Sequence, residues 1–162
     1  PLQDEWYSPL PGVEISLSPS RSLVIHAPSL SKEKLFTHDI AEINERGQFR
    51  ILGRTDNIIT SGGIKISPEI LEQRIGMIGI PYMFTAVQDP VLGQALTLLY
   101  SAESPDITPN AVIARIEGSL SRYERPRYIF NVSALPFTET GKPARARAQA
   151  MAEKLVKDAA DN

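Results

Sequence analysis

A glycine-rich stretch over residues 53–70, GRTDNIITSGGIKISPEI, has side chains suited to binding a ligand. Gly62 and Gly63 remove two side chains where a ligand could approach the backbone closely, and glycine permits a positive φ. Lys65 adds a cation beside them. The stretch lacks the spacing and the first glycine of a nucleotide P-loop, so it indicates a phosphate cradle only weakly. A flexible surface loop with a solvated lysine remains the alternative.

A second candidate is the stretch LPFTETGKPAR at residues 135–145. Pro136 and Gly141 interrupt regular structure on both sides of a polar run, and Lys142 stands beyond the glycine, ahead of the last expected helix. A hydrated ammonium on a flexible stem is suited to bridging phosphate and carboxylate oxygens. The alternative is an ordinary lysine at the start of a helix, although a cation is mildly unfavourable there.

The other reactive side chains give weaker evidence of a catalytic or binding site. His38-Asp39 could form a catalytic dyad, but no Ser or Cys nucleophile lies in a recognisable elbow. The chain has no Cys and only two His, so we expect no disulfide, no thiolate chemistry and no metal site. We interpret the arginines near the end of the chain as a solvated face, because acids intervene and no aromatic residues are regularly interleaved. They are Arg122, Arg125, Arg127, Arg145 and Arg147.

Composition narrows the class of partner. The 162 residues include 17 Lys and Arg and 19 Asp and Glu, with a net charge of −2. Such a mixture gives no general attraction for nucleic acid or anionic lipid. No apolar run approaches the roughly 20 residues that cross a bilayer, and no leader is recognisable. We therefore expect a soluble, cytoplasmic protein without nucleic-acid or membrane partners.

The first third of the chain is predicted to be strand-rich. Residues 13–27 alternate apolar and polar side chains around Pro19, which predicts a β-hairpin with its turn at the proline. Residues 40–53 repeat the pattern, and Gly47 supplies the flexible residue that a tight turn needs.

Helices and strands alternate after the glycine-rich stretch. Ser67-Pro68-Glu69 predicts a helix to about Ile75, and Thr108-Pro109 opens another, whose apolar stripe runs to Tyr123. We expect strands at residues 82–89, 95–102 and 127–135 and a last helix over residues 144–160. The order predicts an α+β fold: N-terminal β-hairpins, then a small domain with a few-stranded sheet and three helices. The change in composition places the boundary between residues 1–55 and 56–162.

Three motifs together resemble a known superfamily. They are THDIAEINERGQFRILGR at residues 37–54, GRTDNIITSGGIKISPEILEQ at 53–73, and LPFTETGKPAR about eighty residues later. The combination is similar to the last portion of the adenylate-forming superfamily of acyl-CoA synthetases, luciferases and peptide-synthetase adenylation domains. The resemblance covers nearly the whole chain. It implies that residues 1–55 end the β-rich large N-terminal domain and that residues 56–162 form the mobile C-terminal lid.

The resemblance implies roles in binding the nucleotide and in turning the lid. Asp39 matches the acid of a T-x-D motif that holds the ribose hydroxyls, although His38 stands where the family prefers Gly. Arg54 matches an arginine that also contacts the ribose. Asp56 matches the hinge residue about which the small domain swings.

It also implies roles in the two chemical steps. Ser61, Gly62 and Gly63 match the loop that lines the pantetheine channel after the swing, and Lys65 lies where the family often has a basic residue near CoA. Lys142 matches the lysine that bridges the substrate carboxylate and the ATP phosphates.

The implied activity is that of an AMP-forming acid–thiol ligase. A carboxylate and ATP give an acyl-adenylate and pyrophosphate, and CoA then gives the thioester and AMP. Residues 60–69 are closer to CoA ligases than to peptide synthetases, and the chain most resembles o-succinylbenzoate:CoA ligases of menaquinone synthesis.

The chain lacks two motifs that this activity needs, a TSGTTGxPK phosphate loop and a YGxTE motif. We therefore expect an inactive C-terminal fragment whose partners are the missing N-terminal domain of the same enzyme and a small carboxylic acid. Mg²⁺ is expected to bind mainly to that missing domain. The alternative is a stand-alone regulatory or binding module derived from such a lid.

Overall fold

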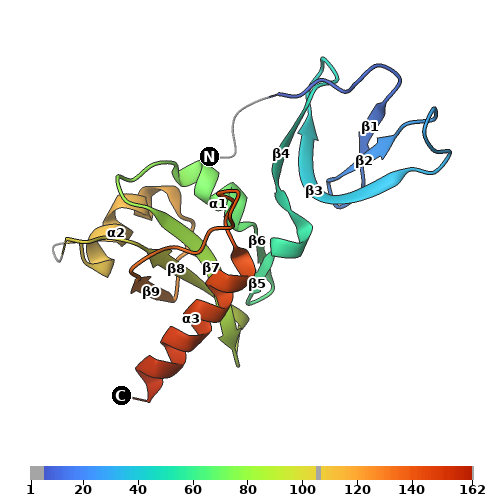
Figure 1. Ribbon diagram of the computed structural model, residues 1–162. Helices are drawn as coiled ribbons and strands as arrows, with labels where there is room; N and C mark the ends of the chain where they lie inside the picture. The colour runs from blue at the N-terminus through green and yellow to red at the C-terminus, as the bar shows by residue number, and fades with distance from the viewer. Residues whose placement is uncertain (1–5, 105–106, 162) are drawn as a thin grey trace. The chain divides into compact units, whose positions relative to one another are not determined.

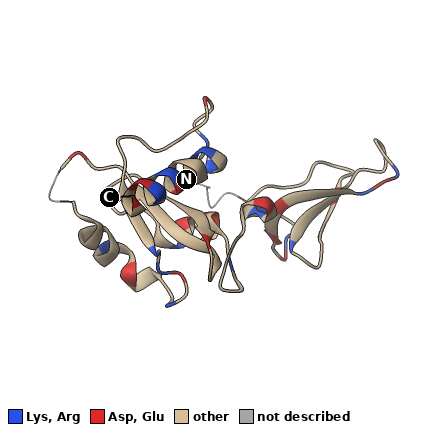
Figure 2. Cartoon of the chain, turned by 90° about the horizontal axis from the view of Figure 1, so that it is seen from below, with Lys and Arg blue, Asp and Glu red and all other residues tan. Residues whose placement is uncertain are grey.

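The computed structural model describes residues 6–104 and 107–161 (Figure 1). The chain divides into two compact units, unit 1 at residues 1–58 and unit 2 at residues 59–162. Acidic and basic residues occur in both units (Figure 2). Among the described residues, no helix combines the length and the apolar character that crossing a membrane requires.

Unit 1 is built on one antiparallel sheet with the strand order β1-β2-β3-β4. Side chains of the turns accept backbone hydrogen bonds: Ser18 Oγ from the amide of Ser22, and Asn44 Oδ1 from the amides of Arg46 and Gln48. Both expected hairpins are therefore confirmed. The strands are β1 Glu14–Leu17, β2 Ser22–His26, β3 Leu35–Ile43 and β4 Phe49–Arg54, and the 3-10 helix η1 Thr55–Asn57 follows.

Unit 2 is built on a five-stranded sheet in which β6, β5, β8 and β7 follow one another and β9 also pairs with β8. β7 and β8 are antiparallel partners along their whole length, from Tyr82 opposite Tyr100 to Asp89 opposite Gly93. β9 is parallel to β8. The strands are β5 Ile59–Ser61, β6 Ile64–Ile66, β7 Tyr82–Asp89, β8 Gly93–Tyr100 and β9 Tyr128–Asn131.

Three helices cover the sheet of unit 2 (Figure 1). They are α1 Pro68–Ile75, α2 Pro109–Ile116 and α3 Arg145–Ala160. Ser67 and Thr108 cap α1 and α2, each accepting the backbone N–H three residues on.

Successive side chains of a strand point to opposite faces of its sheet, and the two faces of unit 2 carry separate apolar cores. One core packs α1 and α2 on the sheet and includes Leu71, Phe84, Leu98, Val112 and Ile116. The other packs α3 on the sheet and includes Met83, Val87, Leu99, Ala148 and Ala152. The α+β class, the three helices and the strand-rich start are thus as predicted.

The helix that opens at Pro109 is shorter than its apolar stripe predicted. α2 ends at Ile116, the 3-10 helix η2 Glu117–Ser119 follows, and Leu120 is extended. Gly118 weakens a continued helix by about 1 kcal/mol relative to alanine. Leu120 still packs on the core from an extended segment, whereas Tyr123 is exposed. The expectation of a helix with an apolar stripe running to Tyr123 was therefore wrong.

Candidate functional site

Three of the candidate residues form a charged cluster in unit 1. Asp39 on β3 lies opposite Arg54 at the end of β4, and Asp56 follows in η1. Arg54 Nη1 donates to Asp39 Oδ1 at 3.0 Å, while its Nε and Nη2 donate to the two oxygens of Asp56 at 2.9 and 2.7 Å. These hydrogen bonds raise the pKa of Arg54 and lower the pKa of Asp56. All three side chains remain open to solvent, so a ligand can reach the cluster.

The side chain of His38, at the position where the superfamily prefers glycine, contacts Thr55 rather than Asp39. Its Nδ1 lies 3.2 Å from Thr55 Oγ1, and the Thr55 hydroxyl also donates to the His38 carbonyl at 3.2 Å. The described hydrogen bonds join the His38 ring to Thr55 and not to Asp39. His38 therefore ties β3 to η1 beside the charged cluster.

The glycine-rich stretch forms a tight hairpin in unit 2, which we call the twin-glycine hairpin and define as residues 59–66. β5 and β6 pair with Ser61 opposite Ile64, so Gly62 and Gly63 make the turn. Their φ angles are 57° and 82°, as a two-residue hairpin turn with glycines requires. A Cβ added at Gly63 would meet no atom within 4 Å, so this side of the turn is open. Lys65 is exposed on β6.

The turn between β7 and β8 supports the twin-glycine hairpin. Gly62 N donates to the Leu92 carbonyl at 2.9 Å, and Thr60 N donates to Gln94 Oε1 at 2.7 Å. Asp89 shapes this turn, because its Oδ1 accepts the amides of Val91 and Leu92 at 2.9 and 2.8 Å. Sequence reasoning missed Asp89, although Asp followed by Pro90 is a turn signal.

Stability should depend on Asp89 in a pH-dependent way. Hydrogen bonds from the amides of Leu92 and Val91, and then attraction from Arg127, lower the pKa of Asp89 below 3.8, although burial opposes this. A carboxyl group whose pKa is lower in the folded state than in the unfolded state stabilises the fold at pH values above its unfolded-state pKa. This stabilisation is lost as the pH falls through the folded-state pKa. We expect Asp89→Asn to be less stable than wild type above about pH 5. The gap between the free energies of unfolding of the two proteins should close as the pH falls below 3.8.

Urea unfolding of both proteins from pH 7 to pH 2.5 measures this gap. Asp161→Asn, at an exposed position just after α3, serves as the matched control and should show no such gap. A constant gap at every pH would contradict the role of the Asp89 charge.

Lys142 lies on a separate, tightly bonded turn of unit 2, which we call the Lys142 turn and define as residues 136–144. Thr138 N donates to the Lys142 carbonyl at 2.8 Å, and Lys142 N donates to Thr138 Oγ1 at 3.1 Å. Gly141 has a φ of 75°, which closes the turn. Across residues 6–104 and 107–161, nothing pairs with the Lys142 ammonium. The backbone is thus fixed while the cation is free.

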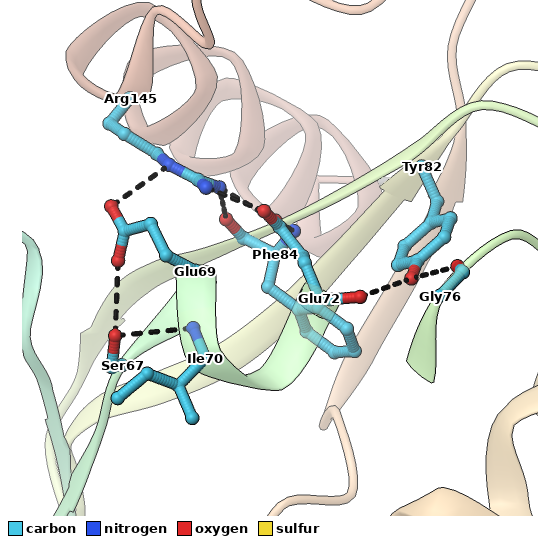
Figure 3. A network of polar contacts seen from close by, with 8 residues as sticks. All are labelled: Ser67, Glu69, Ile70, Glu72, Gly76, Tyr82, Phe84 and Arg145. Atoms are coloured by element: carbon cyan, nitrogen blue, oxygen red, sulfur yellow. Dashed lines mark hydrogen bonds and ion pairs between the residues drawn. The ribbon is translucent and has the colours of Figure 1, made fainter. Parts of the chain in front are cut away.

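A buried polar network lies directly after this turn (Figure 3). Arg145 Nη1 and Nη2 donate to the two oxygens of Glu72 at 2.7 and 2.6 Å, and Nη1 also donates to the Phe84 carbonyl at 2.9 Å. Arg145 Nε lies 3.7 Å from Glu69 Oε1. Burial opposes the charge of Arg145, but hydrogen bonds and attraction from Glu72 and Glu69 outweigh it and raise the pKa.

The solvated-face interpretation is therefore wrong for Arg145, whose side chain is only 14% exposed. A carboxylate 73 positions away neutralises it, and a distant partner leaves no local pattern. Arg125, by contrast, pairs with Glu117 at the surface, as that interpretation expects.

The candidate residues thus fall into three groups: the charged cluster, the twin-glycine hairpin with Lys65, and the Lys142 turn. In the described part of the chain, no group of three His, Cys, Asp or Glu side chains is arranged to hold a metal ion. Within the described residues, the arrangement provides an exposed acid–arginine cluster, an open glycine turn beside the exposed Lys65, and the ammonium of Lys142 on its hydrogen-bonded turn.

Comparison with curated proteins identifies relatives. No family model matches the chain. It is similar to the 2-succinylbenzoate–CoA ligase of Staphylococcus epidermidis, with 34% identity over 119 residues, or 68% of this chain and 24% of that protein. The ligase of Staphylococcus aureus is 33% identical over 117 residues. The chain spans about a quarter of the length of the curated relatives it matches.

Solved structures share the fold. ATP-bound MatB from Rhodopseudomonas palustris has a TM-score of 0.77 at 20% identity, over 91% of this chain and 35% of that chain. An acyl-CoA synthetase (AMP-forming)/AMP-acid ligase II-like protein from Dyadobacter fermentans has a TM-score of 0.53 at 30% identity, over 93% and 44%.

Proposed function

Because this chain belongs to the superfamily of AMP-forming acyl-CoA synthetases, we propose that it is the C-terminal part of an acid–CoA ligase. The complete enzyme would form an acyl-adenylate from a carboxylate and ATP, and then a thioester from the adenylate and CoA. The observation that carries this proposal is the 34% sequence identity to a 2-succinylbenzoate–CoA ligase over 68% of this chain. On the same ground we propose o-succinylbenzoate as the acid and menaquinone synthesis as the pathway.

Lys142 is the proposed catalytic residue of adenylate formation. Negative charge develops where the substrate carboxylate meets the α-phosphate, and a cation held there stabilises the transition state. The free ammonium on a hydrogen-bonded turn supports this role. The side chain can reach a ligand without first breaking an ion pair.

Asp39 and Arg54 are the proposed ribose contacts. A carboxylate accepts hydrogen bonds from both ribose hydroxyls, and a neighbouring guanidinium donates to their oxygens. The exposed pairing of the two residues supports the assignment. Asp56 is the proposed hinge, supported by its place in η1 at the end of unit 1.

Ser61, Gly62 and Gly63 are proposed to line the channel for the thiol arm of CoA, and Lys65 to attract its phosphates. The open side of Gly63 supports close passage of a narrow ligand along the backbone. A loop that must serve a ligand in only one of two domain orientations cannot lie in a core.

The remaining binding functions are proposed to lie outside this chain. The chain spans about a quarter of the length of the curated relatives it matches. On that ground we assign the Mg²⁺ that accompanies ATP, the triphosphate and the acyl pocket to an upstream domain of the same polypeptide.

This proposal predicts that the 162-residue chain alone lacks activity and that the complete protein has it. ATP–pyrophosphate exchange with o-succinylbenzoate measures the first step in both, and benzoate serves as the control acid. ATP–pyrophosphate exchange by the isolated chain would contradict the assignment of the triphosphate and acyl sites to an upstream domain. A complete protein that has no upstream domain with a phosphate loop and shows no exchange would favour the stand-alone binding module instead.

A further inference from the structure

The Arg145 network closes the outer edge of the unit 2 sheet. β7 is the last strand in the order β6-β5-β8-β7. The Phe84 amide donates to Glu72 Oε1 at 2.7 Å, and the Phe84 carbonyl accepts from Arg145. Since both backbone groups of Phe84 bond to side chains, they face away from β8, and Phe84 and Leu98 form a non-hydrogen-bonded antiparallel pair. Glu72 of α1 and Arg145 of α3 thereby join helices on opposite faces across the strand edge.

The same arginine fixes the place where the Lys142 turn meets α3. Only Pro143 and Ala144 separate Lys142 from Arg145. Proline has a fixed φ, and the Ala144 amide donates to the Pro136 carbonyl at 3.0 Å, so this connection is stiff. Arg147, also in the first turn of α3, donates to the Phe137 carbonyl on the other arm of the turn. Movement of the first turn of α3 would therefore move the Lys142 turn with it.

We propose that Arg145 is a positioning residue for Lys142, acting through the first turn of α3. The inference rests on the proposed function of Lys142 and deepens it. Three guanidinium nitrogens contact groups of α1 and β7: Nη1 and Nη2 donate hydrogen bonds to Glu72 and the Phe84 carbonyl, and Nε forms an ion pair with Glu69. The start of α3 is thus anchored to two other elements, and the catalytic ammonium projects from a fixed base.

Lysine cannot replace this arginine without loosening the anchor. An ammonium keeps the positive charge, but it lacks the planar fork that meets both oxygens of Glu72 and the Phe84 carbonyl at once. A displacement of about 1 Å at a catalytic group can cost about a hundredfold in rate. We expect Arg145→Lys in the complete enzyme to slow adenylate formation by about tenfold to a hundredfold.

The test separates positioning from a general loss of structure. Arg145→Lys is made with Lys142 present and with Lys142→Ala, and pyrophosphate release and thioester formation from supplied acyl-adenylate are measured separately. Arg145→Lys should slow adenylation only where Lys142 is present, and thioester formation should be unchanged. Equal slowing in both backgrounds, or of both steps, would overturn the proposal.

A second measurement reads the turn directly in the 162-residue chain. Amide hydrogen exchange at Lys142 and Ala144 should be about tenfold faster in Arg145→Lys, because local opening becomes easier. Arg125→Lys, which alters an exposed arginine pair, is the matched control and should change neither exchange nor rate. Unchanged exchange at the turn would overturn the proposal.

The exchange result also keeps the two hypotheses apart. If Lys142→Ala alone leaves adenylation at the wild-type rate, the proposed function of Lys142 fails. Faster exchange in Arg145→Lys would then still show that Arg145 holds the turn.

Discussion

Lys142→Ala in the complete enzyme is expected to slow adenylate formation by about 10²- to 10³-fold, the range seen when one charge-stabilising donor is removed from a transition state. The turn around Lys142 keeps its backbone hydrogen bonds without the ammonium, since those bonds involve Thr138 and the main chain. The fold should therefore survive. Single-turnover pyrophosphate release measures the effect.

The second half-reaction provides the internal control. Thioester formation from supplied acyl-adenylate should remain near the wild-type rate, because the proposed role of Lys142 is confined to the first step. Lys154→Ala, which removes an exposed lysine from α3, should alter neither step. Adenylation at the wild-type rate by Lys142→Ala would remove the assignment.

The features that the sequence predicted are those encoded by neighbouring residues. The caps at Ser67 and Thr108, each followed by proline, need only three or four residues to be recognised, and both helices begin there. The paired glycines likewise predict a tight turn of positive φ by themselves. The free Lys142 follows from Pro136 and Gly141, which keep regular structure away from it.

The features that the sequence did not predict depend on contacts between distant segments. Glu72 and Arg145 meet only because α1 and α3 flank the same edge strand, and each residue alone reads as a surface charge. The parallel pairing of β8 with β9 likewise joins segments about thirty residues apart. Apolar periodicity misled at Leu120, because an extended segment can bury a side chain at a helical spacing.

The charged cluster of unit 1 illustrates an intermediate case. The resemblance to the superfamily assigned a separate role to each of Asp39, Arg54 and Asp56, but it gave no reason to expect contacts between them. The register of β3 and β4 supplies it by placing Asp39 opposite Arg54. One guanidinium then joins the proposed ribose contact to the proposed hinge.

Glu72→Ala is expected to destabilise unit 2 by about 3 kcal/mol, near the lower end of the range for removing one partner of a buried ion pair. The substitution leaves Arg145 with Glu69 and the Phe84 carbonyl alone, and it removes the acceptor of the Phe84 amide. Both changes leave buried polar groups with fewer hydrogen-bond partners. The loss in free energy of unfolding therefore exceeds the net contribution of the ion pair to stability. Urea unfolding of the 162-residue chain at pH 7 measures the loss.

A surface pair in the same unit supplies the comparison for this value. Glu117 and Arg125 are 50% and 59% exposed, so Glu117→Ala should cost less than about 1 kcal/mol. The difference between the two variants arises from burial, since both remove one carboxylate facing one arginine. Equal losses in the two variants would show that solvent satisfies Arg145 as readily as Arg125, and the anchor between α1, β7 and α3 would then be too weak to position the Lys142 turn.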